Sequence, residues 1–322
     1  MRLSLSCVLL LATLGAAQSP PAPPAPPSAP TAPTPVAAPA AITHSFFVAG
    51  PDFTGILGED GKEIFDTHQP GARDGWVLPS GNVLVAWSKL VLESTREGKI
   101  VFQYALSPDN QELGTVQRLP SGNTLVTELG KVPRLLELDP AGKVAVTVAL
   151  LPETDNAHMQ TRMARKLPSG NYLVPHLLAF QVKEYTPKGE VVKVLRTDLP
   201  ELGGPKSENW PFTAIRLDSG NTLVGLTHGN QVAEFDAAGK VVWSVSNDDL
   251  AGRPIADACG VQRLANGNTV IASYAQTAKD GVKLFEVNRK KQIVWSYTGS
   301  RRVHHFQVLT TNGVAEPVPA RK

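Results

Sequence analysis

From residue 42 onward, short runs of alternating apolar and polar residues are separated by glycine-containing turns, and the runs recur as one two-part phrase. The first part begins at Leu78, Leu119, Leu167, Leu217 and Leu264, and it reads LPSGNTLVTE or a close variant. The second part follows before the next copy begins, as in ELDPAGKVAV and EFDAAGKVVWS. Ser-Gly-Asn and Ala-Gly-Lys supply the positive φ that tight hairpin turns need. Each unit is therefore predicted to be a four-stranded antiparallel sheet.

The five copies are spaced 41 to 50 residues apart, a period that is typical of the four-stranded blades of a β-propeller. The two ends of the repeat region predict one more blade, because residues 45–66 supply three strands and residues 304–313 supply the missing innermost strand. The predicted fold is all-β: a six-bladed β-propeller of four-stranded antiparallel blades over residues 42–314, closed by N- and C-terminal strands that share one blade. Residues 315–322 are expected to form a flexible C-terminal tail.

The first 17 residues have the pattern of a secretory signal peptide. Arg2 gives a positive start, an apolar run spans Leu3 to Leu14, and small residues lead to a predicted cleavage near Ala17. Residues 18–41 hold 10 of the 27 prolines, which predicts a disordered Pro/Ala-rich spacer. The apolar run is shorter than the ~20 residues of a membrane-spanning helix. A secreted or periplasmic protein without a transmembrane segment is therefore expected.

Composition narrows the classes of function. The chain is 42% hydrophobic with a formal charge of +2, which excludes a disordered protein and a highly basic nucleic-acid binder. Once the signal is removed, 30 Lys and Arg face 29 acids, and Cys259 is the one remaining cysteine. No internal disulfide can form, so stability has to come from packing and sheet closure. A monomer is expected.

The repeated phrase resembles the repeats of known propeller families. Its LPSGNTLV and EFDAAGKVVWS segments look like those of PQQ-like, quinoprotein-type propellers and of arylsulfotransferase-like six-bladed propellers. The resemblance covers the whole repeat region and implies the fold. Quinoprotein dehydrogenases have more blades and use an adjacent cysteine pair at the cofactor, which Cys259 alone does not supply. Arylsulfotransferases act through histidines, one of them transiently sulfated, but their histidine motifs do not align with this chain residue by residue.

Six of the seven histidines map to one face of the predicted ring. In each blade the short turns fall on one face, here called the turn face, and the longer connections fall on the other, the loop face, where sites usually lie. The connections between blades enter the central channel, so their side chains could converge there into a cationic, partly aromatic pocket for a small anionic or sugar-like ligand. The candidate binding residues are His68, Arg73, Asp74, His158, Arg162, His176, Trp210, His228, Arg301, His304 and His305.

Several interpretations of the histidines stay open. They form either one shared site or scattered surface and capping residues, and a shared site would either bind a metal or use a histidine as base or nucleophile. His304 and His305 are adjacent on a predicted strand, so their side chains would point to opposite faces and at most one would ligate a metal. No tight metal-ligand spacing occurs, so no cofactor is predicted, and PQQ or a divalent metal is the minor alternative.

A cation precedes the repeated leucine in four of the six blades. These cations are expected to form a ring near the exit of the channel: Arg118, Lys166, Arg216 and Arg263. The ring would either hold an anion or ordered water, or each cation would pair with a carboxylate or carbonyl of a neighbouring blade.

The sequence carries no Gly-rich phosphate loop, nucleophile elbow, His-Glu-x-x-His motif or Cys-x-x-Cys motif. The chain is therefore expected to be a ligand-binding or protein-interaction scaffold that acts through its variable loop face, with no catalytic residue assigned. The alternative is an arylsulfotransferase-like or related lyase or hydrolase that uses a His/Arg-lined channel, and a PQQ-dependent oxidoreductase ranks third. The expected partner is a protein or a small anionic or sugar-like ligand, and no nucleic acid is expected.

Overall fold

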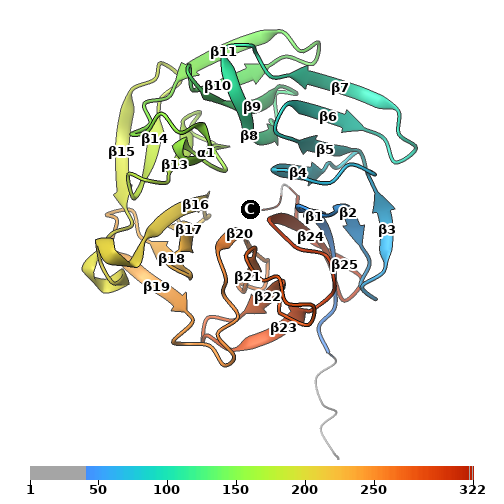
Figure 1. Ribbon diagram of the computed structural model, residues 1–322, viewed down its shortest axis with the longest axis vertical. Helices are drawn as coiled ribbons and strands as arrows, with labels where there is room; N and C mark the ends of the chain where they lie inside the picture. Colours follow the sequence, from blue (N-terminus) through green and yellow to red (C-terminus); the bar gives the residue numbers. More distant parts are fainter. Residues whose placement is uncertain (1–40, 319, 321) are drawn as a thin grey trace, which may run out of the picture. The chain divides into compact units, whose positions relative to one another are not determined.

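The computed structural model describes residues 41–318, 320 and 322. The predicted signal peptide and the predicted spacer up to residue 40 lie outside the described residues. From residue 41 onward, six antiparallel sheets follow one another around a ring (Figure 1). The six-bladed β-propeller predicted from the repeat is thereby confirmed. Within the part of the chain that the structure describes, no helix has the length and hydropathy needed to cross a bilayer.

One blade, blade 1, contains both ends of the repeat region. Its strands from the inside outward are β24 (His305–Thr311), β1 (His44–Ala49), β2 (Thr54–Leu57) and β3 (Glu63–Asp66), and the short strand β25 (Val314–Ala315) pairs with the free side of β24. β1 and β24 are antiparallel, with Phe47 opposite Gln307. This pairing closes the ring without a covalent bond, as predicted, because strands from both ends of the repeat region share one sheet.

The other five blades each use four consecutive strands. Blade 2 contains β4 (Asp74–Val77), β5 (Val83–Ala86), β6 (Leu90–Ser94) and β7 (Ile100–Ala105); blade 3 contains β8 (Asn110–Arg118), β9 (Thr124–Gly130), β10 (Arg134–Leu138) and β11 (Val144–Ala149). Blade 4 follows the short helix α1 (Ala157–Gln160) and contains β12 (Arg165–Lys166), β13 (Tyr172–His176), β14 (Gln181–Tyr185) and β15 (Val191–Arg196). Blade 5 follows the 3-10 turns η1 (Pro200–Leu202) and η2 (Pro205–Ser207) and contains β16 (Asn209–Arg216), β17 (Thr222–His228), β18 (Gln231–Phe235) and β19 (Val241–Ser246). Blade 6 contains β20 (Ala258–Arg263), β21 (Thr269–Ser273), β22 (Leu284–Val287) and β23 (Ile293–Tyr297).

The turn of the repeated phrase has the backbone that its glycine permits. Gly122 has a φ of 89°, and its amide donates to the carbonyl of Leu119 at 2.9 Å. The equivalent glycines of the five copies all have φ between 84° and 92°. Because L-residues with a side chain avoid this region, the repeated glycine sets the turn between the first and second strands of each blade.

The hydrophobic core is divided among the six interfaces between neighbouring blades. Between blades 1 and 2, for example, Phe47 and Ile56 pack against Val83 and Val85. The five other interfaces hold comparable clusters. Because the apolar side chains pack between the blades, polar side chains of the innermost strands and of the connections line the axis of the ring.

The segment predicted as a flexible tail makes contacts along the axis. The amide of Glu316 donates to the carbonyl of Leu309 at 2.8 Å, and Ala320 joins the apolar cluster between blades 2 and 3. Lys322 is 1% exposed, and the end of the described chain lies at the centre of the ring (Figure 1).

Candidate functional site

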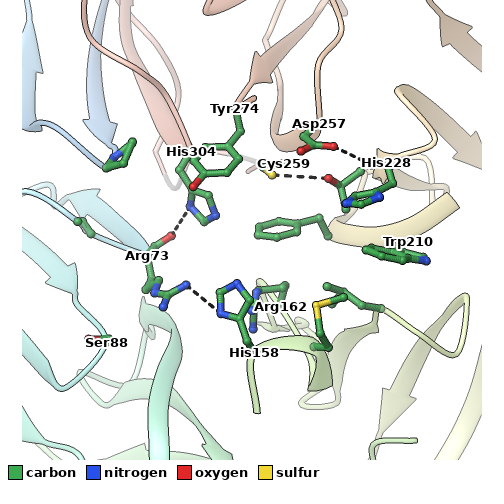
Figure 2. A pocket seen from close by; sticks show the side chains of 17 residues that line it. Arg73, Ser88, His158, Arg162, Trp210, His228, Asp257, Cys259, Tyr274 and His304 are labelled. Atoms are coloured by element: carbon green, nitrogen blue, oxygen red, sulfur yellow. Dashed lines mark hydrogen bonds between the residues drawn. The ribbon is translucent and has the colours of Figure 1, made fainter. Parts of the chain in front are cut away.

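A pocket of about 490 Å³ lies where the connections of the loop face meet the channel. Five blades or their connections contribute to its lining, through residues such as Pro51, Arg73, His158, Trp210 and Tyr274. Figure 2 shows these side chains converging from around the ring. We refer to it as the loop-face pocket, and no single blade could build it.

A partly buried charge cluster forms one side of the loop-face pocket. Glu112 of β8 accepts from Arg73 Nη2 at 3.0 Å, lies 3.4 Å from Arg162 Nη1 and contacts His158 Nδ1 at 3.2 Å. Burial raises the pKa of Glu112, but His158, Arg162 and Arg73 together outweigh burial and bring the pKa below its ordinary value. Two guanidinium groups thus share one carboxylate, and the cluster keeps a net positive charge at neutral pH.

Arg162 is the member of this cluster with spare hydrogen-bonding capacity. Its side chain is 4% exposed and its Nη1 donates to the carbonyl of Thr161 at 2.8 Å. Its Nη2 is buried and donates no hydrogen bond to any described residue, and the side chain itself lines the pocket. Burial lowers the pKa of Arg162 to about 10, so the group is still charged at neutral pH. A buried N–H without an acceptor is costly, and a ligand oxygen would relieve that cost.

The backbone around α1 explains how Arg162 reaches the pocket. Asn156 caps the helix by accepting from the amide of His158 at 3.1 Å, and Thr161 forms an isolated bridge with His176 of β13. The amide of Arg162 donates to the carbonyl of Pro175 at 3.2 Å. The helix ends at Gln160 and Thr161 is extended, and this path of the backbone lets His158 and Arg162 both contact Glu112.

His304 contributes a neutral imidazole next to this cluster. Its side chain is buried, and its Nδ1 lies 3.1 Å from the backbone carbonyl of Arg73, which can only accept a hydrogen bond. Nδ1 therefore carries the proton and Nε2 carries the lone pair. Burial, reinforced by the charges of Arg162 and Arg73, lowers the pKa of His304 to about 3. Figure 2 shows the ring at the pocket edge, and Phe212 and Tyr274 hold it in edge-on contacts at 5.1 and 4.9 Å.

Aromatic rings form the remaining wall. Trp210 of β16 stacks on His228 with ring centroids 4.0 Å apart and an angle of 28° between the planes. His228 has a φ of 56°, and Asp257 fixes that strained residue by accepting from its amide at 3.1 Å. Tyr274 is backed by the guanidinium of Arg302, 4.9 Å from the ring centroid. The pocket thus offers apolar ring faces beside its cationic cluster.

Cys259 lies in the lining of the loop-face pocket but is not a reactive thiol. It is 2% exposed, and burial raises the pKa of its thiol well above the usual range. Its Sγ has a polar neighbour in the Oγ1 of Thr227, 3.9 Å away. A protonated thiol is a poor nucleophile, so Cys259 acts as a small apolar side chain here.

The structure brings six of the sequence-predicted residues together around the loop-face pocket: Arg73, His158, Arg162, Trp210, His228 and His304. Three others lie elsewhere. His68 has an exposed side chain beside Asp66, and Arg301 forms an ion pair with Glu63. His176 is fully buried, with Glu153 at 3.1 Å from Nδ1 and the hydroxyl of Tyr185 at 3.0 Å from Nε2.

The last two predicted residues, Asp74 and His305, lie next to the pocket without lining it. Asp74 and His305 are fully buried in the channel, 3.4 Å apart. Each follows directly after a pocket residue, Arg73 or His304, and the alternation of side chains along an extended backbone turns it away from the pocket.

The cations before the repeated leucine pair with carboxylates of neighbouring blades, which is the second of the two interpretations left open by the sequence. Arg216 lies 3.1 Å from Glu184 of blade 4, and Arg263 lies 2.8 Å from Glu234 of blade 5. Arg118 and Lys166 make the same contact, with Glu93 and Glu137 respectively.

Sequence reasoning did not single out Glu112, Asp257 or Tyr274. Glu112 and Asp257 lie in or next to the connections expected on the loop face, and a search for acids there would have found both. Tyr274 follows β21, where a single aromatic residue gives no periodic signal. In residues 41–318, 320 and 322, no three His, Cys, Asp or Glu residues are grouped so that they could hold a metal ion.

Comparisons with known proteins support the fold. No protein-family model and no curated protein sequence matches the chain. A protein of unknown function from Bacteroides caccae is similar over 82% of this chain and 98% of its own, with 22% identity and a TM-score of 0.71. A virginiamycin B lyase from Staphylococcus aureus, solved as an inactive variant with quinupristin, matches at 13% identity over 79% of this chain and 84% of its own, with a TM-score of 0.55. The WD40 β-propeller domain of Doa1 matches at 11% identity over 79% of both chains, with a TM-score of 0.53.

All three likenesses lie below 25% identity, so they show the β-propeller fold alone. What this chain does has to be argued from its own pocket.

Proposed function

We propose that the protein binds a small organic anion in the loop-face pocket. The observation that carries this proposal is the buried Nη2 of Arg162, which has no acceptor among the described residues and belongs to a side chain that lines the pocket. An anionic oxygen would supply that acceptor and balance the positive charge that Arg73 and Arg162 retain beside Glu112.

The aromatic wall favours an anion that also carries a ring or another apolar part. The stacked pair of Trp210 and His228 and the edge of Phe212 present apolar surface within the same pocket. Aromatic faces accept planar groups and sugar rings, whereas the guanidinium side selects the anionic group. Aryl sulfates, aryl carboxylates and anionic sugars combine both features.

A titration with such ligands tests the binding proposal. Trp210 borders the pocket, so its fluorescence reports occupancy, and Trp210→Phe identifies its share of the signal. Arg162→Gln should weaken binding roughly 10- to 100-fold, because a charge-assisted hydrogen bond in a buried site is worth about 1.5–3 kcal/mol. Arg253→Gln, which changes an exposed arginine far from the pocket, is the matched control and should bind normally.

Two results would contradict the binding proposal. One is the absence of binding for aryl sulfates, aryl carboxylates and anionic sugars alike, which would favour a protein partner on the loop face. The other is equal affinity in the wild type and in Arg162→Gln with the fold intact by circular dichroism.

A second candidate function is catalysis by His304. Its Nε2 lone pair is free of hydrogen bonds among the described residues, and the ring borders the pocket beside Arg162. In an arylsulfotransferase-like reaction, Nε2 would attack the sulfur of an aryl sulfate, the phenolate would leave, and the sulfo group would then pass to an acceptor hydroxyl. A related lyase would use the same nitrogen as a base.

Binding ranks above catalysis because a nitrogen with a pKa of about 3 is a weak base and nucleophile. Release of 4-nitrophenol from its sulfate ester, with a phenol as acceptor, tests this second candidate. Activity that His304→Ala abolishes, with ligand binding retained, would place catalysis first. PQQ has no support in the described residues, since Cys259 has no neighbouring cysteine.

We further propose that binding takes place outside the cytoplasm, as the signal-like pattern of residues 1–17 indicates. Fractionation of cells that express the full chain, followed by N-terminal sequencing, tests this point. A mature chain that starts near residue 18 in the periplasm or medium is expected.

A further inference from the structure

A second polar site lies in the channel, separate from the lining of the loop-face pocket. At its centre, the fully buried carboxylate of Asp74 accepts from Arg165 Nη1 at 2.9 Å and from the amides of Gly75 and Val116 at 2.9 and 3.1 Å. Burial raises the pKa of Asp74, but Arg165, Lys322 and His305 outweigh burial and hold the pKa well below its usual range. The carboxylate is therefore ionised at neutral pH.

The ammonium group of Lys322 completes this site. Its Nζ lies 2.7 Å from the carbonyl oxygen of Gly75, 3.2 Å from His305 Nδ1 and 3.5 Å from Asp74 Oδ1. It also lies 3.9 Å from the ring centroid of Trp76, a cation–π distance. Three acceptors match the three donors of an ammonium group, and the ring face covers the side without an acceptor.

The residues around Lys322 Nζ favour a primary ammonium group over other cations. The two terminal nitrogens of Arg165 already donate to the two carboxylate oxygens of Asp74. The carboxylate therefore has room for one more donor, and that donor has to be compact. His305 uses Nδ1 as the acceptor, and its Nε2 is buried without a described partner. A methylated ammonium would lose the hydrogen bonds, and a second guanidinium would need more room.

We propose that the channel holds a binding site for a primary ammonium group, and that the chain fills this site with its own Lys322. The described residues before it are partly exposed and partly anchored: Val314 and Val318 are 69% and 58% exposed, Glu316 accepts from Thr311 Oγ1 at 2.6 Å, and the carbonyl of Lys322 accepts from Arg165 Nε at 2.9 Å. Most of the burial in this segment lies in Ala320 and Lys322.

The ammonium site lies between two cavities. Val318 and Lys322 border a cavity on the turn face with Pro168 and Arg263. Arg73 and His304, which line the loop-face pocket, are the chain neighbours of Asp74 and His305.

Chemical rescue tests the ammonium site. At pH 6, Lys322→Ala should melt roughly 5–15 °C below the wild type, because it leaves a buried carboxylate with one partner fewer. Propylamine should restore Tm in a saturable manner in Lys322→Ala, and should leave the wild type and Lys322→Ala/Asp74→Asn unchanged. Lys188→Ala removes an exposed lysine and is the matched control. Tetramethylammonium at the same ionic strength should have no effect.

The proposal is overturned if Lys322→Ala melts like the wild type, or if propylamine and tetramethylammonium shift Tm equally in every variant. A second measurement needs no variant. Brief acetylation of the folded wild type, read by mass spectrometry, should modify Lys188 and spare Lys322. Equal modification of both lysines would also overturn the proposal. Neither readout depends on ligand binding in the loop-face pocket, so the two proposals fail independently.

Discussion

The two faces of the propeller use their arginines in different ways. On the turn face, Arg216 meets Glu184 of the preceding blade at 3.1 Å, and three other blades repeat that contact. On the loop face, Arg162 shares Glu112 with Arg73 and keeps one buried donor without a described acceptor. The repeated and satisfied cation belongs to the architecture. The unrepeated and unsatisfied one, Arg162, is the residue on which we base the proposed ligand site.

The repeated pairing is part of a larger clamp between blades. Glu184 also accepts from the side chain of Asn171, the asparagine of its own Ser-Gly-Asn turn, at 2.8 Å. At the interface between blades 6 and 1, His44 takes the place of the cation and contacts Glu286 at 2.8 Å. One turn asparagine and one cation hold Glu93 in the same way, whereas Glu137 is held by Lys166 and by the hydroxyl of Tyr172. The repeated phrase thus has a structural role apart from its turn.

Removal of the closing strand should have the largest effect, because both faces depend on a closed ring. A chain that ends at Arg302 lacks β24, and with it Phe306 and Val308 of the core between blades 6 and 1. We expect the loss of near-UV circular dichroism and of a cooperative melt. A chain that ends at Ala315 keeps β24 and β25 and is the control. A cooperative melt of the shorter chain would show that closure is dispensable.

The next largest effect is expected from acid, which should lower the stability of the fold through its buried neutral histidines. The pKa of His304 is about 3 in the fold and about 6.5 in an unfolded chain, so between these values the unfolded state binds more protons. Its contribution to stability is complete above pH 6.5 and falls by about 1.4 kcal/mol per pH unit below that. His176 and His305 are shifted in the same direction.

Urea unfolding between pH 6.5 and 4.5 measures this slope before most carboxylates titrate. His304→Asn should make the slope shallower, because it removes one of the three histidines whose pKa the fold lowers. An unchanged slope in His304→Asn would mean that His304 is not held neutral by its surroundings.

A substitution in a turn should cost stability without touching the pocket. Gly122 has a φ of 89°, which a β-branched residue adopts only under strain, so Gly122→Val should destabilise by about 1–3 kcal/mol. The added Cβ meets only Pro140, at 3.9 Å, so strain rather than a clash is the cause. Chemical denaturation measures the loss, and Ser121→Ala in the same turn is the control. A Gly122→Val protein of normal stability would contradict the hairpin assignment.

The architecture was predictable from the sequence because each blade repeats the same short-range signals. Turn glycines such as Gly122 and the apolar runs beside them specify a local hairpin, and the period then counts the blades. Even the closure followed, since residues 304–313 supply the one strand that the N-terminal end lacks.

The pocket was predictable only in part, because its residues lie on connections that do not repeat. His304 and His305 were both candidates, yet one borders the pocket and the other faces Asp74, and only the local backbone decides which. His176 was a candidate because it lies beside a connection, but Glu153 and Tyr185 contact both of its ring nitrogens and hold it inside the blade. The burial of Lys322 depends on a long-range contact that no local pattern encodes.

The smallest effects give the most direct test of the difference between the faces. Arg216→Gln should lower stability by about 1 kcal/mol, or about 2–4 °C in Tm, because it breaks a partly exposed ion pair that the ligand does not use. Its affinity for aryl anions should equal that of the wild type.

Arg162→Gln should show the reverse. Its Tm should stay within a degree or two of the wild type, because Glu112 keeps Arg73 and His158, and its affinity should clearly fall. Thermal melts and fluorescence titrations on the two variants measure both quantities. If Arg162→Gln lost stability and kept its affinity, its unpaired donor would be a feature of packing, and the distinction between the two faces would collapse.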